Sequence, residues 1–217
     1  MKNKLIEQLQ NVMPNGMQIP KEIEMLYHYI EDNNLYVDRN GYRYGFLYPK
    51  ASWKENVREG GTNITFFPGG TENLKYWFAG EENEELNQRL CVFAQTGGEG
   101  SESAFWLTDN DELKIIHMGS GSGSMLSCVL ADNALDFLRL LAIGYDEICW
   151  DEDFAYPPNE KPNADFIVKP NIQFQNWVKQ TFDVDIPRTA LEIVKHPACM
   201  DDECSEDAFF NWIQKYL

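Results

Sequence analysis

"RLCVFAQTGGEGSESAFWLTDNDELKIIHMGSGSGSMLSCVL", residues 89–130, decides the fold. Four apolar runs stand in it, "RLCVFAQT", "AFWL", "LKIIHM" and "MLSCVL", and each is separated from the next by Gly, Ser, Asp or Asn. Short apolar runs with tight polar connections predict adjacent strands. This stretch therefore predicts an antiparallel meander, with "RLCVFAQT" as a central, buried strand.

The hydrophobic period changes directly after the last run. "ADNALDFLRLLAIGYDEICW" has Asp132 or Asn133 in position to cap a helix, and Gly144 in position to end it. Asp136 and Arg139 are spaced to pair on one turn. The helix has almost no polar face, so it is expected to be buried against the sheet.

Upstream of the meander, "PKEIEMLYHYIEDNN" predicts a helix that begins at Pro20 and leaves His28 in solvent. "YRYGFLYP" and "TNITFFPGG" predict two further strands, because both are aromatic or β-branched and end in Pro or Gly. "ENLKYWFAG" fits either a short helix or a strand. "EENEE" (81–85) is expected to be an exposed acidic turn.

Downstream, residues 150–169 are expected to form a loop, and residues 170–217 a helical extension. Its three predicted helices are "NIQFQNWVKQTF", "PRTALEIVKH" and "SEDAFFNWIQKYL", the last with Ser205 as cap and an apolar stripe of Phe209, Ile213 and Leu217. Apolar stripes must be buried, so the extension is expected to pack on the core. We predict one α+β domain over 1–217, a curved antiparallel sheet of five or six strands flanked by helices.

Charge and composition limit the function. The formal net charge is −17, which disfavours nucleic acid and anionic membranes and favours basic partners. No apolar run approaches the roughly 18 residues that span a bilayer, and the N-terminus lacks the apolar region of a signal peptide. We expect a cytoplasmic protein with reduced thiols, because the number of cysteines is odd and no secretion signal is seen. They are Cys91, Cys128, Cys149, Cys199 and Cys204.

The loop "HMGSGSGSM" (117–125) raises the question of phosphate binding. Its glycines are Gly119, Gly121 and Gly123, with no lysine after them and a strand, not a helix, expected next. A phosphate-binding loop needs both. The loop is therefore interpreted as a strand connection, or as a contact site where small residues let a backbone or ligand approach closely.

Other motifs are incomplete. "TDNDEL" lacks the glycine of a calcium loop, and "HPACMDDEC" supplies only one half of a zinc site. His117 falls at a strand end beside several serines, but no nucleophile elbow accompanies it. We expect a hydrogen-bonded histidine there. Asp151 and Asp153 are interpreted as part of a solvated acidic cluster. The sequence predicts no catalytic residue, cofactor or metal.

The block from "LCVFAQTGGEGS" to "LRLLAIGYDEI" resembles the SUKH superfamily, which contains fungal cell-wall synthesis regulators and bacterial immunity proteins. The features that carry the resemblance are the strand and turn "ESAFWLTDND", the closing strand with its helix "SCVLADNALDFLRLL", and the early helix "MQIPKEIEMLYHYIEDNN". The match covers about residues 15–148, the expected core; residues 43–80 and the tail after 150 exceed short members. The resemblance implies an α+β fold without a catalytic site or cofactor, and binding to toxins, many of them nucleases.

We therefore expect a non-enzymatic protein-binding domain, an immunity protein for a basic toxin. Alternatives are a regulatory scaffold of the cell-wall-regulator kind and a ligand-binding protein or hydrolase that uses the Gly-rich loops near His117. The oligomeric state stays open. The candidate partner-binding residues are acidic side chains and loop positions; they are Glu81, Glu82, Asp109, Asp111, Glu112, His117, Gly119, Gly121 and Gly123, with Glu84 and Glu85 beside them.

Overall fold

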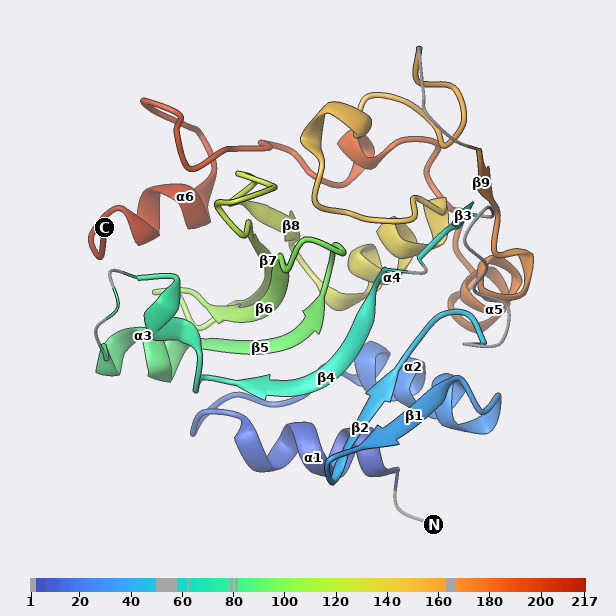
Figure 1. The fold of residues 1–217 in the computed structure, drawn as a ribbon, viewed down its shortest axis with the longest axis horizontal. Helices are drawn as coiled ribbons and strands as arrows, with labels where there is room; N and C mark the ends of the chain where they lie inside the picture. Colours follow the sequence, from blue (N-terminus) through green and yellow to red (C-terminus); the bar gives the residue numbers. More distant parts are fainter. Residues whose placement is uncertain (1–2, 50–57, 62, 79, 81, 163–166) are drawn as a thin grey trace.

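The computed structural model describes residues 3–217 except 50–57, 62, 79, 81 and 163–166. This part of the chain is α+β and is built around an open, seven-stranded antiparallel sheet of order β1-β2-β4-β5-β6-β7-β8 (Figure 1). The strands of this sheet are β1 (Tyr36–Arg39), β2 (Tyr42–Gly45), β4 (Thr65–Gly70), β5 (Leu90–Gln95), β6 (Glu102–Leu107), β7 (Leu113–Met118) and β8 (Val129–Ala131). A separate parallel pair joins β3 (Arg58–Glu59) to β9 (Val168–Lys169).

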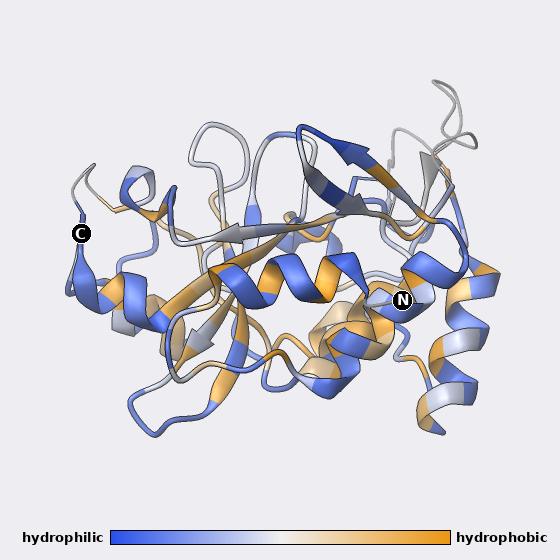
Figure 2. Cartoon of the chain, turned by 90° about the horizontal axis from the view of Figure 1, so that it is seen from below, coloured by the Kyte–Doolittle hydropathy of each residue, from blue (hydrophilic) through white to orange (hydrophobic). Residues whose placement is uncertain are grey.

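Helices cover the sheet and form part of the C-terminal extension. The α-helices are α1 (Lys4–Val12), α2 (Lys21–Asp32), α3 (Glu84–Arg89), α4 (Ala134–Ile143), α5 (Ile172–Phe182) and α6 (Ala208–Ile213). The short 3₁₀ segments are η2 (Leu74–Tyr76), η3 (Asp151–Asp153) and η4 (Ala190–Glu192). Apolar residues concentrate in the central strands and on the inner faces of helices, and polar residues on the outside (Figure 2).

The predicted meander is confirmed, since β5, β6, β7 and β8 are neighbours in sequence order and pair antiparallel. Alternate residues on these strands point to opposite faces of the sheet. On one face Phe93 and Phe105 stack with their ring centroids 4.1 Å apart, and Phe137 of α4 packs against Phe93 edge-on. Helices α1, α2, α4 and α5 share this larger core.

A smaller core lies on the other face of the same strands. Trp106 of β6 packs against Phe209 and Trp212 of α6, with ring centroids 5.4 Å apart in both pairs. Asp207 caps α6 and also accepts a hydrogen bond from the backbone N–H of Val129, which fixes the helix to β8. The expected packing of the C-terminal extension on the core is confirmed.

Several local predictions hold. Helix α2 follows Pro20, and His28 is exposed. Asn133 caps α4, and Gly144 ends it with a φ of 103°. Asp136 and Arg139 pair at 2.7 Å.

Other local predictions were wrong or incomplete. Helix α1 was not predicted, although Asn3 caps it. "PRTALEIVKH" forms only the one-turn η4, and the cap of α6 is Asp207, not Ser205. "MLSCVL" is a strand only from Val129, because Leu126 bridges to Cys199 instead. Leu217, expected in the apolar stripe of the last helix, is 64% exposed.

Candidate functional site

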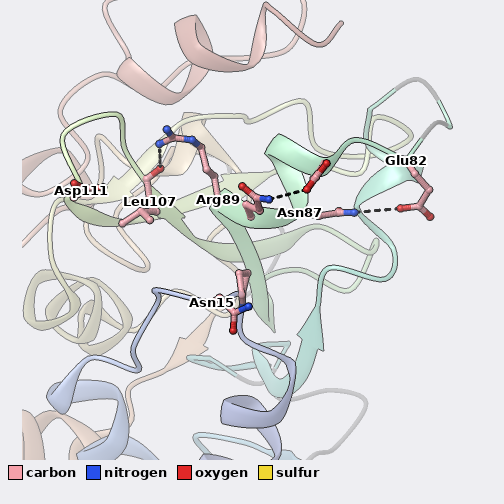
Figure 3. A pocket seen from close by; sticks show the side chains of 9 residues that line it. Asn15, Glu82, Asn87, Arg89, Leu107 and Asp111 are labelled. Carbon is pink, nitrogen blue, oxygen red and sulfur yellow. Dashed lines mark hydrogen bonds between the residues drawn. The ribbon is translucent and has the colours of Figure 1, made fainter.

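A groove of about 740 Å³ lies between α3, the turn that joins β6 to β7, and the segment that joins α1 to α2 (Figure 3). Its walls are mostly polar side chains, and three of them are acidic. The lining residues are Pro14, Asn15, Glu82, Glu84, Asn87, Gln88, Arg89, Leu107 and Asp111. The volume is in the range of sites that hold a small ligand or a few side chains of a partner.

Arg89 joins α3 to the β6–β7 turn. Its Nη1 donates to the backbone carbonyls of Leu107 at 3.1 Å and Thr108 at 2.9 Å (Figure 3 draws the first). The same nitrogen lies 3.3 Å from Asp109, and Nε lies 3.8 Å from Glu85. Arg89 is therefore neutralised and held by its own chain. Because Glu82 is paired with Lys75, Glu84 and Asp111 are left to set the charge of the groove.

Helix α3 and the residues just before it present the acidic side chains of the first wall. Asn83 begins the helix, and its Oδ1 accepts from the backbone N–H of Glu85 at 3.0 Å. Glu82 accepts from Asn87 at 3.3 Å, and Glu84 accepts from Gln88 at 3.0 Å. Hydrogen bonding to Lys75 lowers the pKa of Glu82, which therefore stays ionised.

The β6–β7 turn forms the opposite wall. Thr108 donates its backbone N–H to the carbonyl of Glu112 at 2.9 Å, and its Oγ1 accepts from the backbone N–H of Asn110 and Glu112. Asp111 takes a left-handed φ of 59°, which Asp tolerates better than most residues. The turn is closed on itself, and it leaves Asp109, Asp111 and Glu112 exposed.

The structure divides the predicted partner-binding residues into two groups. Glu82 and Asp111 both line the groove, and Asp109 contacts it through Arg89. Gly119, Gly121 and Gly123 follow the other end of β7, about 17 Å away for a strand of this length. Glu81 lies outside the described residues.

Sequence reasoning missed the neutral part of the groove. Asn15, Asn87 and Gln88 were not singled out, and "EENEE" was interpreted as a turn although α3 begins at Glu84. A helix signal was present, because Asn83 precedes two glutamates and Arg89 follows in the last turn. Asn15 gave no such signal, since only tertiary packing brings the α1–α2 connection to α3.

His117 is a buried structural residue, and its inclusion among partner contacts was wrong. Its side chain has no exposed surface; Nδ1 lies 2.7 Å from the carbonyl of Leu126 and Nε2 lies 2.9 Å from Thr96 Oγ1. The carbonyl can only accept, so Nδ1 carries the proton and Nε2 accepts from Thr96. Burial lowers the pKa of His117 to about 4. The expected hydrogen-bonded histidine at the sheet margin is confirmed.

The Gly-Ser loop is a compact connection, and two of its three glycines lie close to other parts of the chain. A Cβ on Gly119 would lie 2.5 Å from the carbonyl oxygen of Ser124, and one on Gly123 would lie 2.9 Å from the side chain of Glu99. Gly121 has a φ of 72° and open space around it. The close approach that the small residues permit is thus made at Gly119 and Gly123 by other parts of the same chain.

The cysteines and the histidine near them show no metal-binding arrangement. All five thiols are free; Cys91, Cys128 and Cys149 are buried. His196 lies 3.4 Å from Glu206, and Cys199 contacts Asp151. Within the part of the chain that the structure describes, no three His, Cys, Asp or Glu side chains are placed to hold a metal ion.

Comparison of the chain with protein-family models, with curated proteins and with solved structures found no match. The resemblance to the SUKH superfamily therefore stays a prediction. No helix among the described residues is long and apolar enough to cross a membrane.

Proposed function

We propose that this chain is a non-enzymatic protein-binding domain of the SUKH kind, an immunity protein that binds a basic toxin domain through the groove beside α3. The observation that supports this most is the convergence of two acidic segments. Glu82 and Glu84 flank the Asn83 cap of α3, Asp111 comes from the β6–β7 turn, and all three line one groove. Such an arrangement suits a partner with Arg or Lys on a protruding loop.

The charges around the groove favour such a partner. Arg89 and Lys75 are already paired, Arg89 with Asp109 and Lys75 with Glu82, and Lys215 lies 4.0 Å from Asp109. The chain as a whole carries −17, so its long-range field also attracts a basic protein. Complementary charge of this kind raises the association rate more than it raises the final affinity.

The neutral groups of the groove supply hydrogen bonds that charge alone lacks. Asn15, Asn87 and Gln88 each carry an amide that can both donate and accept. They can pair with the backbone of an inserted loop while Glu84 and Asp111 pair with its cations. A nuclease uses basic side chains to hold nucleic acid, so covering them blocks its substrate.

The test measures association with candidate toxin domains encoded by neighbouring genes, over a range of salt concentrations. Glu84→Lys with Asp111→Lys reverses two charges in the groove. We expect the association rate at low salt to fall by about tenfold or more, with a weaker dependence on salt. Protection of cells from the toxin should fall in parallel.

Asp201→Lys with Glu203→Lys is the matched control, because it makes the same change in net charge at two exposed residues of the C-terminal segment. We expect less than about a threefold effect from it. Equal losses in both variants would mean that only net charge matters and would contradict the groove. Absence of binding by the unaltered protein would contradict the immunity function itself.

A further inference from the structure

Strand β1 forms one edge of the seven-stranded sheet and pairs with β2 on its inner side (Figure 1). The backbone N–H of Phe46 donates to the carbonyl of Leu35 at 2.8 Å, just before the strand begins. Residue pairs along an antiparallel ladder are alternately hydrogen-bonded and non-bonded. Because Leu35 is a bonded position, Tyr36 and Asp38 are non-bonded ones, and their backbone N–H and C=O groups point away from β2. Among the described residues, no hydrogen bond uses these outward groups.

The hairpin of β1 and β2 is held firmly on its inner side. Asn40 and Gly41 form its turn with φ values of 52° and 87°, as a type I′ turn requires. Gln8 of α1 donates to the carbonyl of Gly41 at 2.8 Å and accepts from the backbone N–H of Arg43 at 2.9 Å. Arg43 also donates twice to Asp38, at 3.1 Å and 2.8 Å. The outward groups of β1 therefore need little ordering when another strand pairs with them, which lowers the cost of binding.

The charges on this hairpin are balanced except at one residue. Arg43 pairs with Asp38 and Glu31, and Lys4 of α1 pairs with Asp38. Arg39 is exposed and has no ion pair with any described residue. It lies on the face of β1 opposite to that of Asp38, because side chains alternate along a strand. An unpaired charge on an edge strand discourages unselective pairing, and it favours a strand that brings the opposite charge.

We propose that β1 is a docking edge for an extended segment of a partner protein, which carries an acidic side chain beside Arg39 and an apolar side chain beside Val37. The backbone groups of Tyr36 and Asp38 supply the hydrogen bonds, and the side chains supply the selectivity. A carboxylate beside Arg39 compensates the charge that otherwise protects the edge. The net charge of −17 acts against a run of acidic residues, so the segment carries a single one.

A second copy of this chain fits the edge less well. Antiparallel pairing of two β1 strands about Val37 would set Arg39 beside Leu35 of the other copy, which leaves the arginine without a carboxylate. Pairing about Asp38 would bring like charges together. Both copies would also carry −17, and this charge opposes their association. The edge is separate from the proposed groove, because no groove residue belongs to β1 or β2.

The test adds a synthetic peptide, acetyl-Thr-Glu-Thr-Val-Thr-amide, to the isotope-labelled full-length protein. In antiparallel pairing its Glu lies beside Arg39 and its Val beside Val37. We expect amide hydrogen exchange of Tyr36 and Asp38 to slow by about threefold or more when the peptide is in excess. The amides of Val37 and Arg39 are internal controls, because they already bond to β2. A peptide with Lys in place of Glu should bind about threefold more weakly.

Arg39→Glu should reverse the preference between the two peptides. Lys21→Glu makes the same change in net charge at an exposed residue at the far end of α2, and it should leave the preference unchanged. Unchanged exchange at Tyr36 and Asp38 with both peptides, or an unaltered preference in Arg39→Glu, would overturn the proposal.

Two further outcomes identify other causes. Protection of Tyr36 and Asp38 that appears without peptide and grows with protein concentration would make a second copy the occupant, and would overturn a partner segment. Glu84→Lys with Asp111→Lys should leave peptide binding unchanged, because these residues line the groove. If the peptide binds but no toxin domain does, the docking edge stands and the proposed immunity function fails.

Discussion

The two ends of strand β7 differ in how they use polar residues. At the groove end, Asp109 and Asp111 are exposed, and the turn that carries them is held by one threonine and one arginine. At the Gly-Ser end, His117 and Ser124 are buried and make their hydrogen bonds inside the protein. The acidic side chains at the groove end remain exposed to a partner, whereas the polar side chains at the Gly-Ser end are already hydrogen-bonded within the protein.

This difference separates binding from stability. A buried polar group that loses its partner costs roughly 1–3 kcal/mol, whereas an exposed ion pair contributes roughly 0–1 kcal/mol. Substitutions at the Gly-Ser end should therefore destabilise the fold. Substitutions at the groove end should leave the fold nearly intact and change what it can bind.

The largest effect on stability is expected for Gly119→Ala. The new Cβ would lie 2.5 Å and 2.8 Å from the carbonyl oxygens of Ser124 and Leu126, which are backbone atoms and cannot turn aside. We expect a loss of about 2–3 kcal/mol in the free energy of unfolding, measured with urea. Gly121→Ala is the control: it meets no atom within 4 Å, and its positive φ should cost only about 1 kcal/mol. Equal losses would show that the loop is not closely packed.

Acid should destabilise the fold through His117, because a buried imidazole resists protonation. The folded pKa of His117 is lowered to about 4 from 6.5, so the unfolded chain takes up this proton at a higher pH than the folded one. Its contribution is complete above about pH 6.5 and is lost as pH falls toward 4. The measurement is the difference in unfolding free energy between the unaltered protein and His117→Gln across this range. If the difference does not change with pH, the histidine is not buried in solution.

The sequence predicts the Gly-Ser end well, because its determinants are local. The run "LKIIHM" forms β7, and Lys114 and His117 lie on opposite faces as its alternation requires. Hydrophobic period and glycine spacing operate over a few residues, and both are visible in a single sequence. They located the strand, its histidine and the connection after it, although they could not identify the atoms that Gly119 approaches.

The groove end was only half predictable, because it is assembled from distant segments. The sequence identified the acidic residues as candidates. It could not show that they converge, because this depends on how β6 and α3 pack. Asn15 reaches the groove through the packing of α1, a helix that was not predicted from the sequence.

The smallest of these effects on stability is expected at the groove end, for Asn83→Ala. Asn83 Oδ1 accepts from the backbone N–H of Glu85 at 3.0 Å and of Leu86 at 3.2 Å, and this cap begins a helix of only six residues. Its removal should cost about 1 kcal/mol, whereas Asn83→Ser should keep most of the cap. Amide hydrogen exchange should show the loss confined to α3, and toxin association should weaken because Glu84 and Gln88 lose their fixed positions. A loss as large as that of Gly119→Ala would contradict the contrast, because the groove end would then support the fold as much as the Gly-Ser end does.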